Sequence, residues 1–258
     1  MRIQRWWLPT AVVLLVGIGL AAYPTLQFSS QTLSGEKNKS YSDNQPNPTS
    51  KHSPTTDITT QTAEALYQGV SPAVVTVYGA DGMGSGMILR PDGLLLTNKH
   101  LIDNVAAVKV KTATGATYDG TVVDFDLRYD LALIRLKGQN LNLPIVMLAN
   151  STAVQAGDRI YAIGSPGGKA GTMTTGTFTR ITEHGSLQTS TGLLSPGNSG
   201  GPLLNAQGQV IGVNKGLLSN KTGLATPISA AKNLINRYDQ INNQKASAPW
   251  MEQEARTY

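Results

Sequence analysis

The sequence predicts an all-β protein built of two small antiparallel barrels in series, followed by one helix. Short apolar, β-branched runs divided by turn residues begin near Val70, and glycine (27 residues) and proline (13 residues) are plentiful, as many turns require. No amphipathic stretch long enough for a parallel crossover lies between the runs, so the strands are expected to be antiparallel. Two similar sets of strands favour two closed barrels, because closure removes exposed sheet edges.

The N-terminal residues 1–28 predict an export segment. Arg2 and Arg5 precede an apolar run from Trp6 to Tyr23, which is marginally long enough for a bilayer that needs about 20 apolar residues. The positive charges favour a start in the cytoplasm, so the rest of the chain is expected outside it, for example in a periplasm. A retained single-pass anchor is the favoured prediction, and a cleaved signal peptide that releases a secreted protein stays an alternative.

Composition also sets the expected domain boundaries. Residues 29–62 are rich in Ser, Thr, Asn and Pro and nearly empty of apolar side chains, which predicts a disordered linker. The folded body is then expected over residues 63–241, with barrels over about 63–140 and 141–228 and a helix over 228–241. Residues 242–258 are expected to form a C-terminal tail.

Six apolar runs predict the strands of the first barrel. They are AVVTVYG (73–79), GMILR (86–90), LLLTN (94–98), AAVKVKT (106–112), TYDGTVVDF (117–125) and LALIRL (131–136). Turn signals such as Pro91-Asp92-Gly93 separate several of them.

Further runs predict the second barrel and the helix. The runs are IVML (145–148), DRIYAIGS (158–165), MTTGTFTRIT (173–182), LQTS (187–190), PLLN (202–205), QVIGVN (209–214) and GLATPI (223–228). A helical period appears only afterwards, where Ala231, Leu234, Ile235 and Tyr238 fall on one face. That helix is expected to pack on the second barrel.

Charge and cysteine content exclude several functions. The formal net charge is +5, but the basic residues are scattered singly, which argues against a nucleic-acid partner. The absence of cysteine excludes disulfides, thiol catalysis and thiolate metal sites. The glycine-rich stretch around GSPGGKAGT has Ile163 where a phosphate loop needs its leading glycine, and GMGSG lacks dinucleotide-binding spacing. We therefore predict no cofactor and no metal.

The stretch LLSPGNSGGPLLN raises the question of whether Ser199 is a nucleophile or a turn residue. Gly197 to Gly201 spell Gly-x-Ser-x-Gly, which is also the nucleophile signature of α/β-hydrolases. Those enzymes need a histidine after the serine, yet no histidine follows Ser199 in this chain. The α/β-hydrolase hypothesis therefore fails, and short glycine-rich clusters are otherwise usually turns.

A serine nucleophile needs a base, and the chain has three histidines. His100 follows an apolar strand, where its ring can be held rigidly, and it is the favoured base. His52 lies in the predicted linker, and His184 is expected in a surface hairpin turn.

A carboxylate is needed to orient the base, and Asp130 is the favoured one. It opens the apolar run LALIRL, where it can be desolvated and accept a hydrogen bond from the imidazole. Asp119, Asp124 and Asp126 are the alternatives, with the last two expected at solvated strand edges.

Five blocks then resemble one known family in order and spacing. They are GSGMILRPDGLLLTNKHLI, DLRYDLALIRL, GDRIYAIGSPGG, GNSGGPLLNAQGQVIGVN and GLATPI, and together they resemble the bacterial HtrA (Deg) branch of the trypsin-like serine proteases over about residues 64–240. The resemblance implies two six-stranded barrels with a substrate cleft between them. It implies a serine endopeptidase in which His100 and Asp130 come from the first barrel and Ser199 from the second. Lys99 departs from the asparagine that is frequent in the family before the histidine.

The resemblance also assigns the oxyanion hole and the substrate pocket. The backbone amides of Gly197 and Ser199 match the oxyanion hole, with Asn198 shaping the loop between them. The floor of the pocket for the residue before the cut falls on Leu193 and Leu194, and its wall is completed by Val213 and Gly216. An apolar floor favours small or medium apolar side chains over Lys or Arg. Ordinary core packing is the alternative role of the two leucines.

Partners and competing functions complete the expectations. The family implies unfolded or damaged proteins as substrates, and it often forms trimers, so a homotrimer is compatible with the sequence. Only a short tail follows the terminal helix, so the PDZ domain that many relatives carry is not expected here. A proteolytically silent, membrane-tethered chaperone on the same fold and an esterase using the same triad are the competing functions.

Overall fold

The computed structural model describes residues 55–79, 82–103, 105, 107–166 and 171–247, with side chains from residue 63 onward. The predicted export segment, His52, most of the predicted linker and the last part of the predicted tail lie outside these residues. In the part of the chain that is described, no helix is long and apolar enough to cross a membrane.

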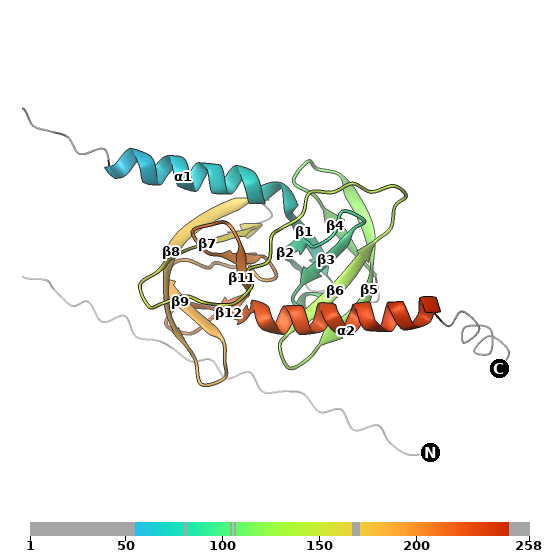
Figure 1. The fold of residues 1–258 in the computed structure, drawn as a ribbon. Coiled ribbons are helices and arrows are strands. Elements are labelled where there is room, and N and C mark those ends of the chain that lie inside the picture. Colours follow the sequence, from blue (N-terminus) through green and yellow to red (C-terminus); the bar gives the residue numbers. More distant parts are fainter. Residues whose placement is uncertain (1–54, 80–81, 104, 106, 167–170, 248–258) are drawn as a thin grey trace, which may run out of the picture. The chain divides into compact units, whose positions relative to one another are not determined.

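The first barrel closes in the order β1-β2-β3-β6-β5-β4, with every pair antiparallel. Its strands are β1 (Val74–Gly79), β2 (Gly82–Ile88), β3 (Leu94–Thr97), β4 (Ala107–Lys111), β5 (Thr117–Asp126) and β6 (Leu131–Leu136). Closure is completed where β1 pairs with β4, so that no strand is left with a free edge (Figure 1).

The second barrel closes in the order β10-β11-β12-β9-β8-β7, again with antiparallel pairs. Its strands are β7 (Arg159–Gly164), β8 (Thr172–Ile181), β9 (Leu187–Thr191), β10 (Pro202–Leu204), β11 (Val210–Leu217) and β12 (Thr222–Pro227). The predicted all-β body of two six-stranded antiparallel barrels with a C-terminal helix is therefore confirmed.

The predicted strand at IVML (145–148) is wrong. The segment connects the barrels and forms only an isolated bridge between Leu148 and Val210. The Val146 amide donates to the Ile88 carbonyl of the first barrel at 3.0 Å. The Val210 amide of the second barrel donates to the Met147 carbonyl at 2.8 Å. Val146 and Leu148 of this run pack against the cluster between the barrels, whereas Ile145 and Met147 are exposed, and none of the four enters a sheet.

The structure contains one helix that the sequence does not predict and a second that is longer than predicted. Helix α1 (Thr55–Val70) takes up the last residues of the predicted linker 29–62, and helix α2 (Ile228–Ser247) continues past the predicted end at residue 241. Leu66 and Val70 attach α1 to the core. The polar residues at its start are also helical, because each residue added to a nucleated helix gains one backbone hydrogen bond. The same cooperativity extends α2 through its polar last turns.

Three hydrophobic clusters hold the two barrels. One fills each barrel, and the third lies between the barrels and includes residues of both helices. Alternate residues of one strand serve different clusters: Leu95 points into the first barrel, whereas Leu94 and Leu96 face the cluster between the barrels. Such strands are buried on both faces, which explains why they are continuously apolar.

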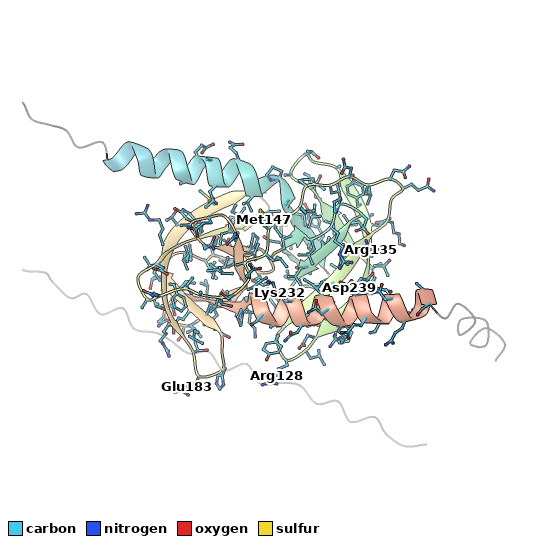
Figure 2. All side chains as sticks on the ribbon, in the orientation of Figure 1. Arg128, Arg135, Met147, Glu183, Lys232 and Asp239 are labelled. Atoms are coloured by element: carbon cyan, nitrogen blue, oxygen red, sulfur yellow. The ribbon has the colours of Figure 1, made fainter. Side chains whose placement is uncertain are left out.

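Polar side chains tie α2 to the rest of the body. The Arg237 guanidinium donates to both Asp124 carboxylate oxygens, at 2.7 and 3.1 Å, and this hydrogen bonding raises the pKa of Arg237. Arg90 pairs with Asp239, and the labelled Arg135 and Asp239 mark where α2 meets the first barrel (Figure 2). The helix also contacts β11 and β12, so it braces both barrels and not only the second.

Candidate active site

The turn that carries His100 is fixed to the residue that carries the favoured carboxylate. His100 lies in a short 3-10 helix (Lys99–Ile102) directly after β3. The Lys99 amide and the Asn98 side chain both donate to the backbone carbonyl of Asp130, at 3.2 and 2.9 Å. The two segments therefore hold each other in register although they are far apart in sequence.

The Asp130 carboxylate contacts His100 through both of its oxygens. One oxygen accepts the His100 backbone amide at 2.9 Å, and the other lies 2.8 Å from the imidazole Nδ1. Asp130 has a φ of 56°, a left-handed conformation that aspartate tolerates better than most residues. An ionised carboxylate only accepts hydrogen bonds, so Nδ1 carries the proton and Nε2 is left as an acceptor.

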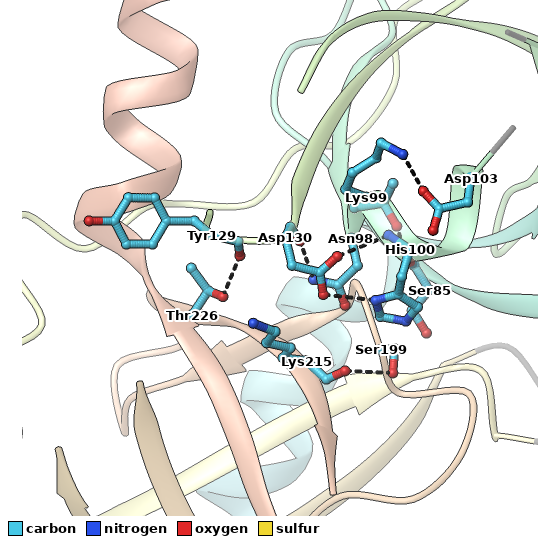
Figure 3. A network of polar contacts seen from close by, with 11 residues as sticks. Ser85, Asn98, Lys99, His100, Asp103, Tyr129, Asp130, Ser199, Lys215 and Thr226 are labelled. Atoms are coloured by element: carbon cyan, nitrogen blue, oxygen red, sulfur yellow. Dashed lines mark hydrogen bonds and ion pairs between the residues drawn. The ribbon is translucent and has the colours of Figure 1, made fainter. Parts of the chain in front are cut away.

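Ser199 comes from the second barrel and lies beside the His100 ring in the close view (Figure 3). Its hydroxyl donates to the backbone carbonyl of Lys215 at 3.2 Å. Long or diverted catalytic hydrogen bonds are common before substrate binds.

Some backbone amides of the Ser199 loop donate hydrogen bonds within the protein, and others do not. Asn198, Gly200 and Gly201 donate to backbone carbonyls at 2.8 to 3.0 Å. The amides of Gly197 and Ser199 have no acceptor among the described residues. Two neighbouring free donors beside a serine hydroxyl are the arrangement that an oxyanion requires.

Asn198 shapes this loop. Its backbone amide binds the Ser195 carbonyl at 3.0 Å, and its side-chain oxygen accepts the Ser195 hydroxyl at 3.2 Å. Gly197 has a φ of 98°, and a Cβ there would lie 2.6 Å from the Ser165 carbonyl oxygen. Only glycine fits this turn without strain.

The residues predicted to line the substrate pocket fall in different surroundings. Leu193 and Leu194 belong to the core of the second barrel, and Val213 belongs to the cluster between the barrels. Only Gly216 has open space where a side chain would stand. Their role in specificity stays a prediction.

Two cavities border the site that sequence reasoning did not find. A cavity of about 140 Å³ is lined by Gly82, Met83, His100 and Leu101. A larger cavity, of about 680 Å³, is lined by residues that include Tyr129 and Lys215. Tyr129 precedes Asp130 in the chain, and the Lys215 carbonyl accepts the Ser199 hydroxyl. No local motif marks either cavity, because each is formed by segments that are distant in sequence.

The alternative candidates are engaged elsewhere. Asp124 binds Arg237, and Asp126 accepts the Tyr129 amide at 3.0 Å. Asp119 pairs with Lys109, whose hydrogen bond lowers the Asp119 pKa. His184 is exposed in the β8–β9 turn and lines the larger cavity. Among the described residues, no three His, Cys, Asp or Glu side chains are grouped so that they could hold a metal ion.

A comparison with family models matches residues 84–213 to the trypsin-like peptidase domain. The chain belongs to the trypsin-like peptidase family. As in the sequence prediction, its curated relatives carry HtrA and Deg names.

Three curated relatives illustrate the likeness of this trypsin-like peptidase. The putative serine protease HhoA of Synechocystis is 38% identical over 168 residues, covering 60% of this chain and 42% of that protein. The probable periplasmic serine endoprotease DegP-like of Chlamydia pneumoniae is 36% identical, covering 60% and 34%. Serine protease HTRA1 of Xenopus laevis is 38% identical, covering 51% and 30%. The chain spans less than half the length of each.

A solved structure agrees with the fold of the family. The serine endoprotease from Yersinia pestis superimposes with a TM-score of 0.61 at 29% identity, covering 68% of this chain and 65% of that one. The likeness therefore extends over both sequence and structure.

Proposed function

We propose that this trypsin-like peptidase is a serine endopeptidase that uses His100, Asp130 and Ser199 as its catalytic triad. One observation supports the proposal: His100 is hydrogen-bonded to Asp130, and Ser199 of the second barrel lies beside its ring, next to two backbone amides without an acceptor among the described residues. The relatives' names as serine proteases support peptide bonds as the target.

The proposed reaction proceeds through an acyl-enzyme. Ser199 leaves the Lys215 carbonyl, transfers its proton to His100 Nε2 and attacks the substrate carbonyl carbon. His100 then gives this proton to the leaving amine as the peptide C–N bond breaks. Water repeats the sequence on the ester, with His100 as base, and releases the acid and free Ser199. Asp130 stabilises the imidazolium throughout.

The amides of Gly197 and Ser199 supply the proposed oxyanion hole. They stabilise the negative charge that forms on the substrate oxygen during each attack. A donor of this kind lowers the barrier by about 3 kcal/mol. Asn198 is proposed only to hold their spacing.

We propose unfolded or damaged proteins outside the cytoplasm as substrates. The DegP-like relative carries the word periplasmic in its name, and the predicted export segment would likewise place the body of this chain outside the cytoplasm. Attachment to the membrane through residues 1–28 and assembly into a homotrimer stay predictions.

Labelling with a fluorophosphonate tests the mechanism. We expect the full-length chain to gain one adduct by intact mass and to degrade casein, whereas Ser199→Ala does neither. Labelling without casein degradation, together with turnover of a small ester, would favour the esterase. A folded wild-type protein that is neither labelled nor active would favour the silent chaperone.

The residue preceding the cut is expected to be small or medium and apolar, such as Val, Ala or Leu. The family resemblance puts the buried Leu193 and Leu194 at the pocket floor, where a preference for Lys or Arg would need a buried carboxylate. Mapping the cuts in casein by mass spectrometry measures this preference. Predominant cleavage after Lys or Arg would contradict it.

A further inference from the structure

Ser85 connects the first barrel to the loop that holds the nucleophile. It lies on β2, and its side chain is fully buried. Its amide donates to the Ser199 carbonyl at 2.7 Å, and its hydroxyl donates to the Gly197 carbonyl at 2.6 Å. The two residues that Ser85 binds are the two whose own amides are available for an oxyanion.

We infer that Ser85 is a positioning residue that sets the oxyanion hole of Gly197 and Ser199, an inference that rests on the proposed function. Each peptide unit is rigid, so a carbonyl held in place restricts the backbone of the residue that carries it. Gly197 has no Cβ and can adopt many backbone conformations. The hydrogen bond from Ser85 removes this freedom before substrate binds.

The direction of the Ser85 hydroxyl is itself fixed. Its oxygen accepts the Ser165 amide at 2.9 Å, so its hydrogen is directed to Gly197. The Ser85 carbonyl accepts the Thr97 hydroxyl at 2.6 Å. A buried group whose donor and acceptor are both satisfied holds its partners in a single arrangement.

The surroundings of Ser85 admit only a small side chain. A Cβ added at Gly164 would lie 2.9 Å from the Ser85 hydroxyl oxygen, and one added at Gly201 would lie 3.1 Å from the Ser85 Cβ. A larger residue at position 85 would therefore press on the loop. A hydroxyl on a single carbon meets both the spatial and the hydrogen-bonding requirement.

Ser85→Ala tests this role, with Thr76→Val as the matched control. Thr76 is equally buried and donates to the Ser165 hydroxyl at 2.8 Å, but it makes no hydrogen bond to the Ser199 loop. In Ser85→Ala the fold is expected to persist, because the Ser165 amide already lies 3.4 Å from the Gly197 carbonyl and can pair with it directly. That pairing draws Gly197 out of its catalytic position.

We expect Ser85→Ala to lower kcat for a peptide substrate by about 10- to 100-fold with little change in KM. Its affinity for a peptide boronate, which places an anionic oxygen in the oxyanion hole, should fall in parallel. Thr76→Val should keep the wild-type kcat and boronate affinity even where it lowers stability. Ser85→Cys, which retains a weaker donor, should lie between wild type and Ser85→Ala.

Three results would overturn the inference. They are a wild-type kcat in Ser85→Ala, a rise in KM with kcat unchanged, and equal losses in Ser85→Ala and Thr76→Val. If Ser85→Ala does not fold, Ser85→Cys decides by the same kcat and boronate measurements. An inactive wild-type protein would instead reject the proposed function, so the two failures are distinguishable.

Discussion

Replacing Asp130 by Asn is expected to lower kcat by about 10⁴-fold without unfolding the protein. Asparagine tolerates the left-handed backbone at this position, where φ is 56°. The His100 backbone amide, which donates to one carboxylate oxygen at 2.9 Å, selects the orientation of the new side chain. The amide oxygen of Asn must face that donor, so its NH₂ group faces Nδ1.

The consequence for His100 is the wrong tautomer. With a donor facing it, Nδ1 becomes an acceptor, and the ring proton moves to Nε2, where it cannot accept the proton of Ser199. Asp126→Asn is the matched control, since its side chain accepts the Tyr129 amide at 3.0 Å and asparagine can do the same. Single-turnover kinetics with a peptide substrate measures both variants. A nearly unchanged kcat in Asp130→Asn would assign the orienting carboxylate elsewhere.

The fold could be predicted because its signal is local. Apolar, β-branched runs and turn residues mark the strands of both barrels. The failure at 145–148 shows the limit of that signal, since an apolar run looks the same in a strand as in a connection. Ile145 and Met147 are exposed there, and the backbone pairs with both barrels instead of following one ladder.

Helix α1 and the last turns of α2 were also beyond the local signal. Residues 55–62 and 242–247 are largely polar, and polar composition predicts linkers and tails. In the structure they continue helices whose other ends are attached to the core, and Asn242 bonds back to the Tyr238 carbonyl at 3.0 Å. Tertiary attachment of one end thus decides the conformation of the other.

The candidate site divides in the same way. His100, Asp130 and Ser199 could be selected from the sequence, because few residue types serve this chemistry and the blocks around them resemble a known family. Ser85 could not, since its hydroxyl acts on Gly197, which is 112 positions away. Nothing in GMGSG itself indicates this role, because the partners of Ser85 belong to the second barrel.

The glycine after the nucleophile supports the second large prediction, in which Gly200→Ala destabilises the protein by roughly 2–6 kcal/mol, the sum of backbone strain and overpacking. Gly200 has a φ of 83°, and a Cβ there would lie 2.1 Å from the Ser85 carbonyl oxygen and 2.3 Å from the Thr97 hydroxyl. The Ser85 carbonyl belongs to the backbone of β2 and cannot move aside as the end of a flexible side chain can. The loop must therefore move away from the first barrel, and fluorophosphonate labelling should be lost with it.

Gly115→Ala separates strain from contact. Gly115 has a similar φ of 90°, but no atom lies within 4 Å of its added Cβ, so the variant should lose only about 1–2 kcal/mol. Urea unfolding of both variants measures the difference, which is the cost of forcing the two barrels apart at Ser85. Equal destabilisation would mean that the loop moves freely against the first barrel. A greater loss in Gly200→Ala would mean that the geometry of the nucleophile depends on close contact between the barrels.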